Sequence, residues 1–131
     1  MDKDKLIKKI NDFFLELGMS TETIANGMWV IRDEFENIEN IVVSLEEPIV
    51  IFRVKLMKIP TTNREQFYEK LLTMNASSLV HGAYAIENGN VVIVDTLQSE
   101  NLDLNEFQAS IESLSLAIAQ DYKQLSQYLN K

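Results

Sequence analysis

The sequence predicts an α+β fold, a two-layer sandwich with a largely antiparallel sheet and the element order α-β-β-β-α-β-β-α. Three patterns predict it: apolar stripes at helical spacing, β-branched runs of period two, and turn pairs between those runs. Hairpin-style links make neighbouring strands antiparallel and leave the helices on one face. Because domains cluster at about 100–150 residues, we expect residues 1–131 to form one domain.

The first expected element is an amphipathic helix over residues 5–17. Its apolar stripe consists of Leu6, Ile7, Ile10, Phe13, Phe14 and Leu17. Charged residues such as Lys8 and Glu16 lie opposite this stripe, as in a helix that packs on a core. Gly18 follows where a C-terminal cap belongs, because glycine adopts the left-handed conformation freely. The helix is therefore expected to end at Leu17.

Three strands are expected between residues 28 and 59. Residues 28–31 follow the turn pair Asn26-Gly27, and residues 41–45 follow a polar loop over 33–40. Residues 49–59 follow Glu46-Glu47-Pro48, a turn that predicts a hairpin. No separate strand is expected before Asn26.

The longest of these strands has two different faces. One face consists of Val50, Phe52, Val54 and Leu56, and we expect it to be buried. The other face consists of Ile49, Ile51, Arg53 and Lys55. Met57 continues this face by alternation, although it is apolar. The second face is expected to be wet, although two isoleucines share it with the cations.

A second helix and a second hairpin follow Pro60. Residues 62–65, Thr-Asn-Arg-Glu, match a capping box at a helix start. The helical stripe after it consists of Phe67, Tyr68, Leu71, Leu72 and Asn75. Strands over 83–86 and 91–94 flank Asn88-Gly89, a strong hairpin signal because both turn positions need positive φ. Residues 91–94 are apolar on both faces, which suggests that something covers the second face.

The chain from Asp103 predicts one long helix, opened by the cap-like quartet Asp103-Leu104-Asn105-Glu106. Its stripe consists of Leu104, Phe107, Ile111, Leu114, Ile118, Leu125 and Leu129, with Asp121 or Tyr122 at the remaining step. A helix of about 27 residues spans roughly 40 Å, which is longer than the core of so small a domain requires.

Composition and charge argue against nucleic-acid and membrane partners. Twelve basic against 20 acidic residues give a net charge of −8, which repels phosphate backbones and anionic lipids. The densest basic cluster is Lys3, Lys5, Lys8 and Lys9. We interpret it as a solvated helix face, because aspartates share that helix. Trp29, Phe52 and Tyr84 are interpreted as core residues, because no interleaved arginines accompany them as on a base-stacking platform.

The sequence contains no combination of residues that predicts catalysis or a cofactor. Cysteine is absent and His81 is the single histidine, which excludes thiolate chemistry and histidine-rich metal sites. Acidic pairs such as Glu34/Glu36 lack calcium-loop spacing, and the four glycines form no phosphate-binding pattern. We therefore expect a non-enzymatic protein without a cofactor. Neither a secretory signal nor a membrane-length apolar run is visible, so we expect a cytoplasmic protein.

Apolar surface remains beyond the needs of one small core. It consists of Ile49, Ile51, Val92 and Val94, together with the long C-terminal helix. Two interpretations stay open: the helices cover these residues, or they form a homodimer contact and a groove for another polypeptide. On the second interpretation, these four residues are the candidate protein-binding site.

A family resemblance adds a candidate partner. It rests on residues 67–75, Phe-Tyr-Glu-Lys-Leu-Leu-Thr-Met-Asn, and 82–92, Gly-Ala-Tyr-Ala-Ile-Glu-Asn-Gly-Asn-Val-Val. This stretch resembles the LL-x-x-N … GA-x-A-x-x-x-x-G-x-V pattern of type III secretion chaperones of the Tir-chaperone (CesT-like) class and of YbjN-type proteins. Element order, size and low isoelectric point agree with them. The resemblance implies a homodimer that holds a partly extended client protein on apolar patches. The alternative is a YbjN-like regulatory or small-ligand-binding domain.

Overall fold

The computed structural model describes residues 2–33, 38–79 and 81–130. The helices are α1 (Lys3–Leu17), α2 (Arg64–Ser77), α3 (Leu104–Ser126) and the short 3₁₀ helix η1 (Gln127–Asn130). The strands are β1 (Thr21–Ala25), β2 (Met28–Asp33), β3 (Ile38–Glu46), β4 (Ile49–Lys58), β5 (Ala83–Glu87) and β6 (Asn90–Gln98). The strands form one six-stranded antiparallel sheet in the order β1-β2-β3-β4-β6-β5. The predicted α+β fold is confirmed, with one strand more than expected.

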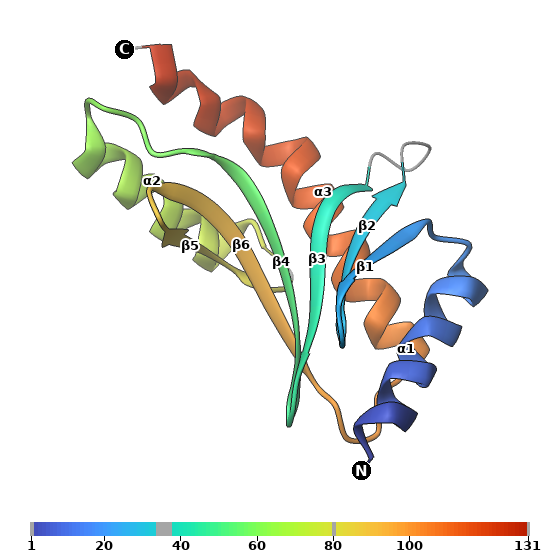
Figure 1. Ribbon diagram of the computed structural model, residues 1–131. Coiled ribbons are helices and arrows are strands. Elements are labelled where there is room, and N and C mark those ends of the chain that lie inside the picture. The colour runs from blue at the N-terminus through green and yellow to red at the C-terminus, as the bar shows by residue number, and fades with distance from the viewer. Residues whose placement is uncertain (1, 34–37, 80, 131) are drawn as a thin grey trace.

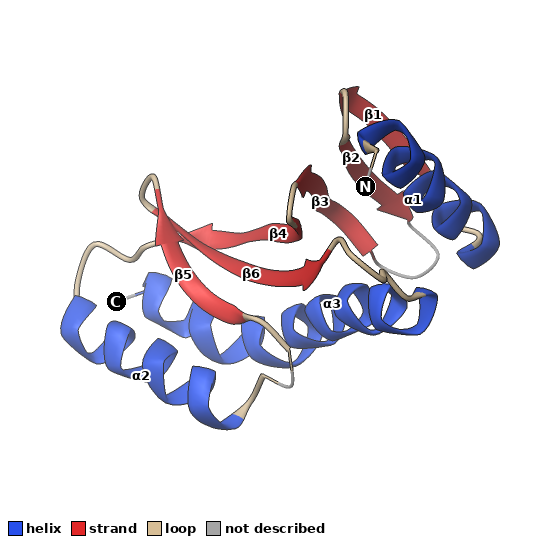
Figure 2. Ribbon diagram, turned by 90° about the horizontal axis from the view of Figure 1, so that it is seen from below, coloured by secondary structure: helices blue, strands red, loops and turns tan. Residues whose placement is uncertain are grey.

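The helices cover one face of the strongly twisted sheet (Figures 1 and 2). Figure 2 shows α2 and α3 beneath β4, β6 and β5, and α1 beside β1 and β2. We call the helix-covered surface the inner face and the opposite surface the outer face. In the described part of the chain no helix packs on the outer face.

The unexpected strand is β1, at one edge of the sheet. It pairs with β2 from Thr21 opposite Ile31 to Ala25 opposite Met28, with Gly27 at φ +81° in the turn between them. All five β1 residues are exposed. A strand that buries neither face does not need alternating apolar residues, and so the period-two pattern could not reveal it.

The helix ends differ in how well local sequence predicted them. Helix α1 ends at Leu17 with Gly18 at φ +67°, as expected. The N-cap of α2 is Asn63, at φ +56°, rather than the predicted Thr62, and the Asn63 side chain makes no capping hydrogen bond. Asparagine tolerates the left-handed conformation, and here it starts the helix one residue later than the box requires. The Nε of Arg64 donates to the Pro60 carbonyl oxygen at 2.9 Å.

Strand β4 follows the expected alternation until the last few residues before its C-terminal end. Val50, Phe52 and Val54 are buried on the inner face. The register with β6 then shifts between Lys55 and Met57, so that Met57 is buried and Leu56 is only half-buried. The expected burial of Leu56 and wet position of Met57 are therefore reversed. The cause is a bulge, in which one extra residue inverts the faces.

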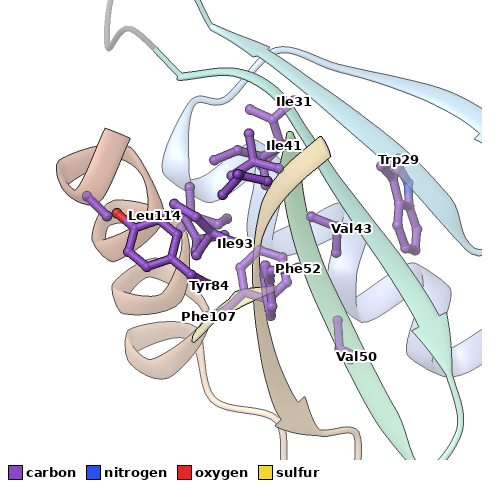
Figure 3. Close-up of a cluster of buried hydrophobic side chains, with 14 of the residues drawn as sticks. Trp29, Ile31, Ile41, Val43, Val50, Phe52, Tyr84, Ile93, Phe107 and Leu114 are labelled. Atoms are coloured by element: carbon purple, nitrogen blue, oxygen red, sulfur yellow. The ribbon is translucent and has the colours of Figure 1, made fainter. Parts of the chain in front are cut away.

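An aromatic cluster centres the core between the inner face and the helices. The ring of Phe107 in α3 meets Phe13 and Phe14 of α1 and Phe52 of β4, each at a centroid distance of 5.3 Å. Trp29 of β2 joins through Phe14 at 5.8 Å. Figure 3 shows how strand residues such as Phe52 and helix residues such as Phe107 meet in this layer. The expectation that Trp29, Phe52 and Tyr84 are core residues is confirmed.

The C-terminal helix begins as predicted but ends earlier. The carboxylate of Asp103 accepts hydrogen bonds from the backbone N–H groups of Asn105 and Glu106, at 2.6 and 3.3 Å. The regular α-helix stops at Ser126 and continues as η1. Of the two candidates for the remaining stripe position, Asp121 is buried and Tyr122 is exposed.

Candidate protein-binding surfaces

The four candidate residues lie together on the outer face. In the β4–β6 ladder Ile51 pairs with Thr96, and Arg53 pairs with Val94. Residues paired across antiparallel strands share a face, and so do residues two apart along one strand. The shared surface therefore carries Ile49, Ile51, Val92 and Val94. The structure thus places two pairs that are about 40 residues apart in the sequence on one face, with Ile51 and Val94 close to each other and Ile49 and Val92 at the two ends.

The helices do not cover these candidate residues. Ile49, Ile51 and Val94 are half-buried, and Val92 is 4 % exposed. Val92 lies between Lys55 of β4 and Ala85 of β5 in the two ladders, so that neighbours on the same face enclose it. Of the four candidates, Ile49, Ile51 and Val94 are therefore partly open on the outer face, whereas Val92 is buried.

A second apolar surface lies between α2 and the edge strand β5, where the sequence analysis expected none. It is a groove of about 220 Å³ lined by Tyr68, Leu71, Leu72, Asn75, Tyr84, Ala85 and Ile86. Leu72 is 69 % exposed and Ile86 is 49 % exposed. The available signal was Leu72, since it lies on the predicted helical stripe without facing the core. We call this surface the α2–β5 groove.

The backbone edge of β5 is closed at Tyr84. The carboxamide of Asn75 in α2 accepts from the Tyr84 backbone N–H at 2.6 Å and donates to the Tyr84 carbonyl oxygen at 3.3 Å. An edge strand normally leaves such groups open to pairing with another chain. The Asn75 carboxamide occupies the two backbone groups of Tyr84 that a neighbouring strand would otherwise bind. Addition of a foreign strand along β5 would have to displace it.

Tyr84 also ties the same edge strand to α3. Its hydroxyl donates to the Oδ2 of Asp121 at 2.5 Å, and Asp121 is 5 % exposed. Burial, and after it the hydrogen bond to and the negative charge of Asp121, raise the pKa of the Tyr84 hydroxyl above its ordinary value. The hydroxyl therefore keeps its proton and stays a donor to the buried carboxylate.

The polar candidates from the sequence are His81 and the acidic residues. No group of three His, Asp or Glu residues among them could hold a metal ion. His81 is exposed in the bend before β5. Glu46 accepts a hydrogen bond from the Ser44 hydroxyl at 3.0 Å, whereas Glu34 and Glu36 lie outside the described residues.

Within the described ranges, none of the helices is both long enough and apolar enough to cross a membrane.

Solved structures define the class of fold. The chain resembles YbjN from E. coli, a putative transcription regulator, with a TM-score of 0.68 and 15 % identity over 90 % of this chain and 92 % of that one. It resembles a chain of the HopA1–SchA chaperone–effector complex, with a TM-score of 0.63 and 12 % identity over 100 % and 99 %. It also resembles a chain of the ExoU–SpcU complex from the type III secretion system of Pseudomonas aeruginosa. Here the TM-score is 0.56 and the identity 16 %, over 92 % of this chain and 95 % of that one.

At these identities the likeness is one of fold. The family follows from the sequence itself: the chain belongs to the CesT_Tir_1 family, which it matches over residues 3–131. The resemblance seen in residues 67–92 is therefore confirmed. No curated protein matches the chain by sequence.

Proposed function

We propose that this chain is a non-enzymatic, chaperone-like protein that binds a segment of another polypeptide on the outer face of its sheet. The observation that carries the proposal is the position of Ile49, Ile51, Val92 and Val94 on the one face that no described helix covers. Membership of the CesT_Tir_1 family supports it. So does the likeness of its fold to a chain of the HopA1–SchA chaperone–effector complex.

The degree of burial indicates what kind of segment fits. Fully burying an isoleucine or valine side chain contributes about 1.5–3 kcal/mol, and these side chains are already half-buried or more. Each contact therefore adds only part of that free energy. Useful affinity requires many such contacts along the roughly 33 Å length of β4 (10 residues). An extended client segment provides them, whereas a compact contact at one point does not.

We propose in addition that two copies pair through the α2–β5 groove. Leu72 and Ile86 both line this groove and are 69 % and 49 % exposed, so that exposed apolar side chains and an apolar hollow belong to one surface. A twofold contact needs such a self-complementary surface. Because Asn75 closes the β5 backbone at Tyr84, the contact would use side chains rather than a continuous intermolecular sheet. The outer face of each copy would remain open to its client.

An unfolded model client tests the binding surface. We expect the full chain to bind reduced, carboxymethylated α-lactalbumin in fluorescence anisotropy, and the double variant Ile49→Thr/Ile51→Thr to bind at least tenfold more weakly. Threonine keeps the β-branched shape and removes apolar area. Leu15→Gln is the matched control, because Leu15 is 78 % exposed on α1. An equal loss of affinity in the double variant and in Leu15→Gln would mean that the client does not bind specifically to the outer face.

Sedimentation velocity tests the pairing. We expect a dimer for the unmodified chain and a monomer for Leu72→Glu, because a glutamate in an apolar contact is desolvated without a partner. Ile51→Thr should leave the dimer intact. A monomer at every concentration in the unmodified chain would refute the pairing without touching the client surface.

The alternative, a YbjN-like regulatory domain that binds a small ligand, has one structural observation in its favour. A depression of about 420 Å³ lies where α1, the β3–β4 turn and the β6–α3 connection meet, lined by Leu6, Lys9, Glu47, Pro48, Ser99, Glu100 and Asn101. A rise in Tm with a small metabolite, together with no binding of the unfolded client, would favour this alternative.

A further inference from the structure

The outer face carries cations among its apolar residues. Arg53 pairs with Val94, and Lys55 pairs with Val92. On its other side Arg53 pairs with Val42 of β3. The apolar surface proposed to hold a client is therefore interrupted by two positive side chains.

The chain itself pairs only one of these two cations among the described residues. The Nε of Arg53 lies 3.5 Å from the Oε2 of Glu87, and this buried nitrogen has no hydrogen-bond partner. Lys55 and Lys58 are exposed, and neither forms an ion pair with the described residues. With Glu87 included, Arg53, Lys55 and Lys58 leave this part of the outer face with a positive local charge, although the whole chain carries a net charge of −8.

A client that covers the apolar residues also removes water from the cations. Taking a charge out of water costs several kcal/mol unless a counter-charge replaces the hydration. Paired valines of β6 flank Arg53 and Lys55, so that a segment lying over Val92 and Val94 must come close to both. The occupant that meets this requirement brings its own carboxylates.

We propose that the client segment is acidic as well as apolar, with two carboxylates spaced to meet Arg53 and Lys55. This inference rests on the proposed function. Successive outward side chains of β4 are about 7 Å apart, and in order they are Lys55, Arg53, Ile51 and Ile49. An extended segment that matches them has period two: acidic, acidic, apolar, apolar at every second residue.

The acidity of the whole chain does not oppose such a ligand. Charges farther apart than about 8 Å are largely screened at physiological ionic strength. The exposed aspartates of α1, such as Asp4 and Asp12, belong to the helix layer on the other side of the sheet. Nucleic acid is a poorer candidate, because a long phosphate backbone extends beyond the few cations into the acidic surroundings.

Three fluorescent peptides test the inference on the full chain. They share a Ser-spaced, period-two design with two valines and differ in the first two outward residues, which are Glu, Gln or Lys. We expect the Glu peptide to bind at least tenfold more tightly than the Lys peptide in anisotropy at 50 mM NaCl. The preference should shrink at 300 mM NaCl.

Charge reversal locates the preference. We expect Lys55→Glu, at an exposed position, to remove the advantage of the Glu peptide, and Arg53→Gln to weaken it. Lys123→Glu on α3 makes the same change of charge away from the outer face and should leave the preference intact. If Lys123→Glu acts as strongly as Lys55→Glu, net charge alone decides binding and the inference is overturned.

The outcomes separate this inference from the proposed function. Equal binding of the Glu, Gln and Lys peptides, lost in Ile49→Thr/Ile51→Thr, would overturn the acidic client and leave the apolar client surface standing. Failure of all three peptides while carboxymethylated α-lactalbumin still binds would overturn the acidic client alone, and failure of that protein as well would overturn both. Displacement of the Glu peptide by a 12-mer of oligothymidylate would show that phosphate satisfies the same cations and would overturn the assignment to protein carboxylates.

Discussion

The two faces of the sheet arise from the same alternation along β4 and meet different environments. Val50 and Phe52 point to the inner face and are fully buried against the helices. Ile49 and Ile51 point the other way and stay half-buried beside Arg53. Residues of similar apolar character are therefore found in different environments on the two faces. The inner face stabilises the fold, and no described helix covers the outer face.

The contrast shows that apolar residues alone do not mark a core. A core position requires a second layer above it, and here α1, α2 and α3 all supply that layer to one side (Figure 2). The outer face receives none from the described chain. Substitutions on the two faces should therefore separate stability from binding.

The largest effect is expected at the centre of the inner face. Phe107→Ala removes the ring that touches Phe13, Phe14 and Phe52, and a Phe→Ala change in a core costs about 3–5 kcal/mol. Ile51→Ala on the outer face should cost less than about 2 kcal/mol, because the site is open and no cavity forms. Urea denaturation measures both. Similar losses at the two positions would contradict the distinction between the faces.

An intermediate effect is expected where the sheet edge meets α3. Tyr84→Phe removes the hydroxyl that Asp121 accepts from and leaves a buried carboxylate without that donor. Such a loss costs about 1–3 kcal/mol. Tyr122→Phe, at an exposed tyrosine of the same helix, is the matched control and should cost little. An equal effect of the two changes would show that the buried hydrogen bond contributes nothing.

The same pair predicts a dependence on alkaline pH. The folded pKa of Tyr84 is raised above its value in the unfolded chain, so its contribution to stability is fully present below about pH 10. Above that pH the unfolded state loses the proton first and stability falls. The stability difference between the unmodified chain and Tyr84→Phe should shrink by up to about 1.4 kcal/mol per pH unit. Denaturation midpoints between pH 8 and 11 measure it, and a constant difference would contradict it.

The smallest effect is expected at the closed edge. Asn75→Ala frees the Tyr84 backbone N–H and carbonyl, and two neutral hydrogen bonds contribute about 1–2 kcal/mol together. Asn75→Asp keeps the acceptor and should retain part of this. Hydrogen exchange at the Tyr84 amide reports it directly and should quicken in Asn75→Ala while the Phe52 amide changes less. Unaltered exchange would mean that Asn75 does not protect the edge.

Local patterns predicted most of the elements. Caps such as Gly18 and Asp103, and the turn pair Asn88-Gly89, depend on backbone chemistry within a few residues. Strand β1 was missed because it buries no face. The bulge after Lys55 was missed because pairing with β6, and not the sequence of β4 itself, sets the register. The start of α2 was predicted one residue too early because Asn63 adopts the left-handed conformation, which its residue type permits but does not require.

The candidate surfaces depended still more on the tertiary structure. The sequence by itself determined that Ile49, Ile51, Val92 and Val94 are apolar residues beyond those that one buried sheet face needs, since alternation is a property of a strand alone. Tertiary structure decided that the two pairs share one face, that the helices all pack on the other side, and that Arg53 and Lys55 lie beside Val94 and Val92. It also joined Asn75 to Tyr84 and Tyr84 to Asp121. Such contacts depend on how separate elements pack, and no local periodicity encodes the choice of partner.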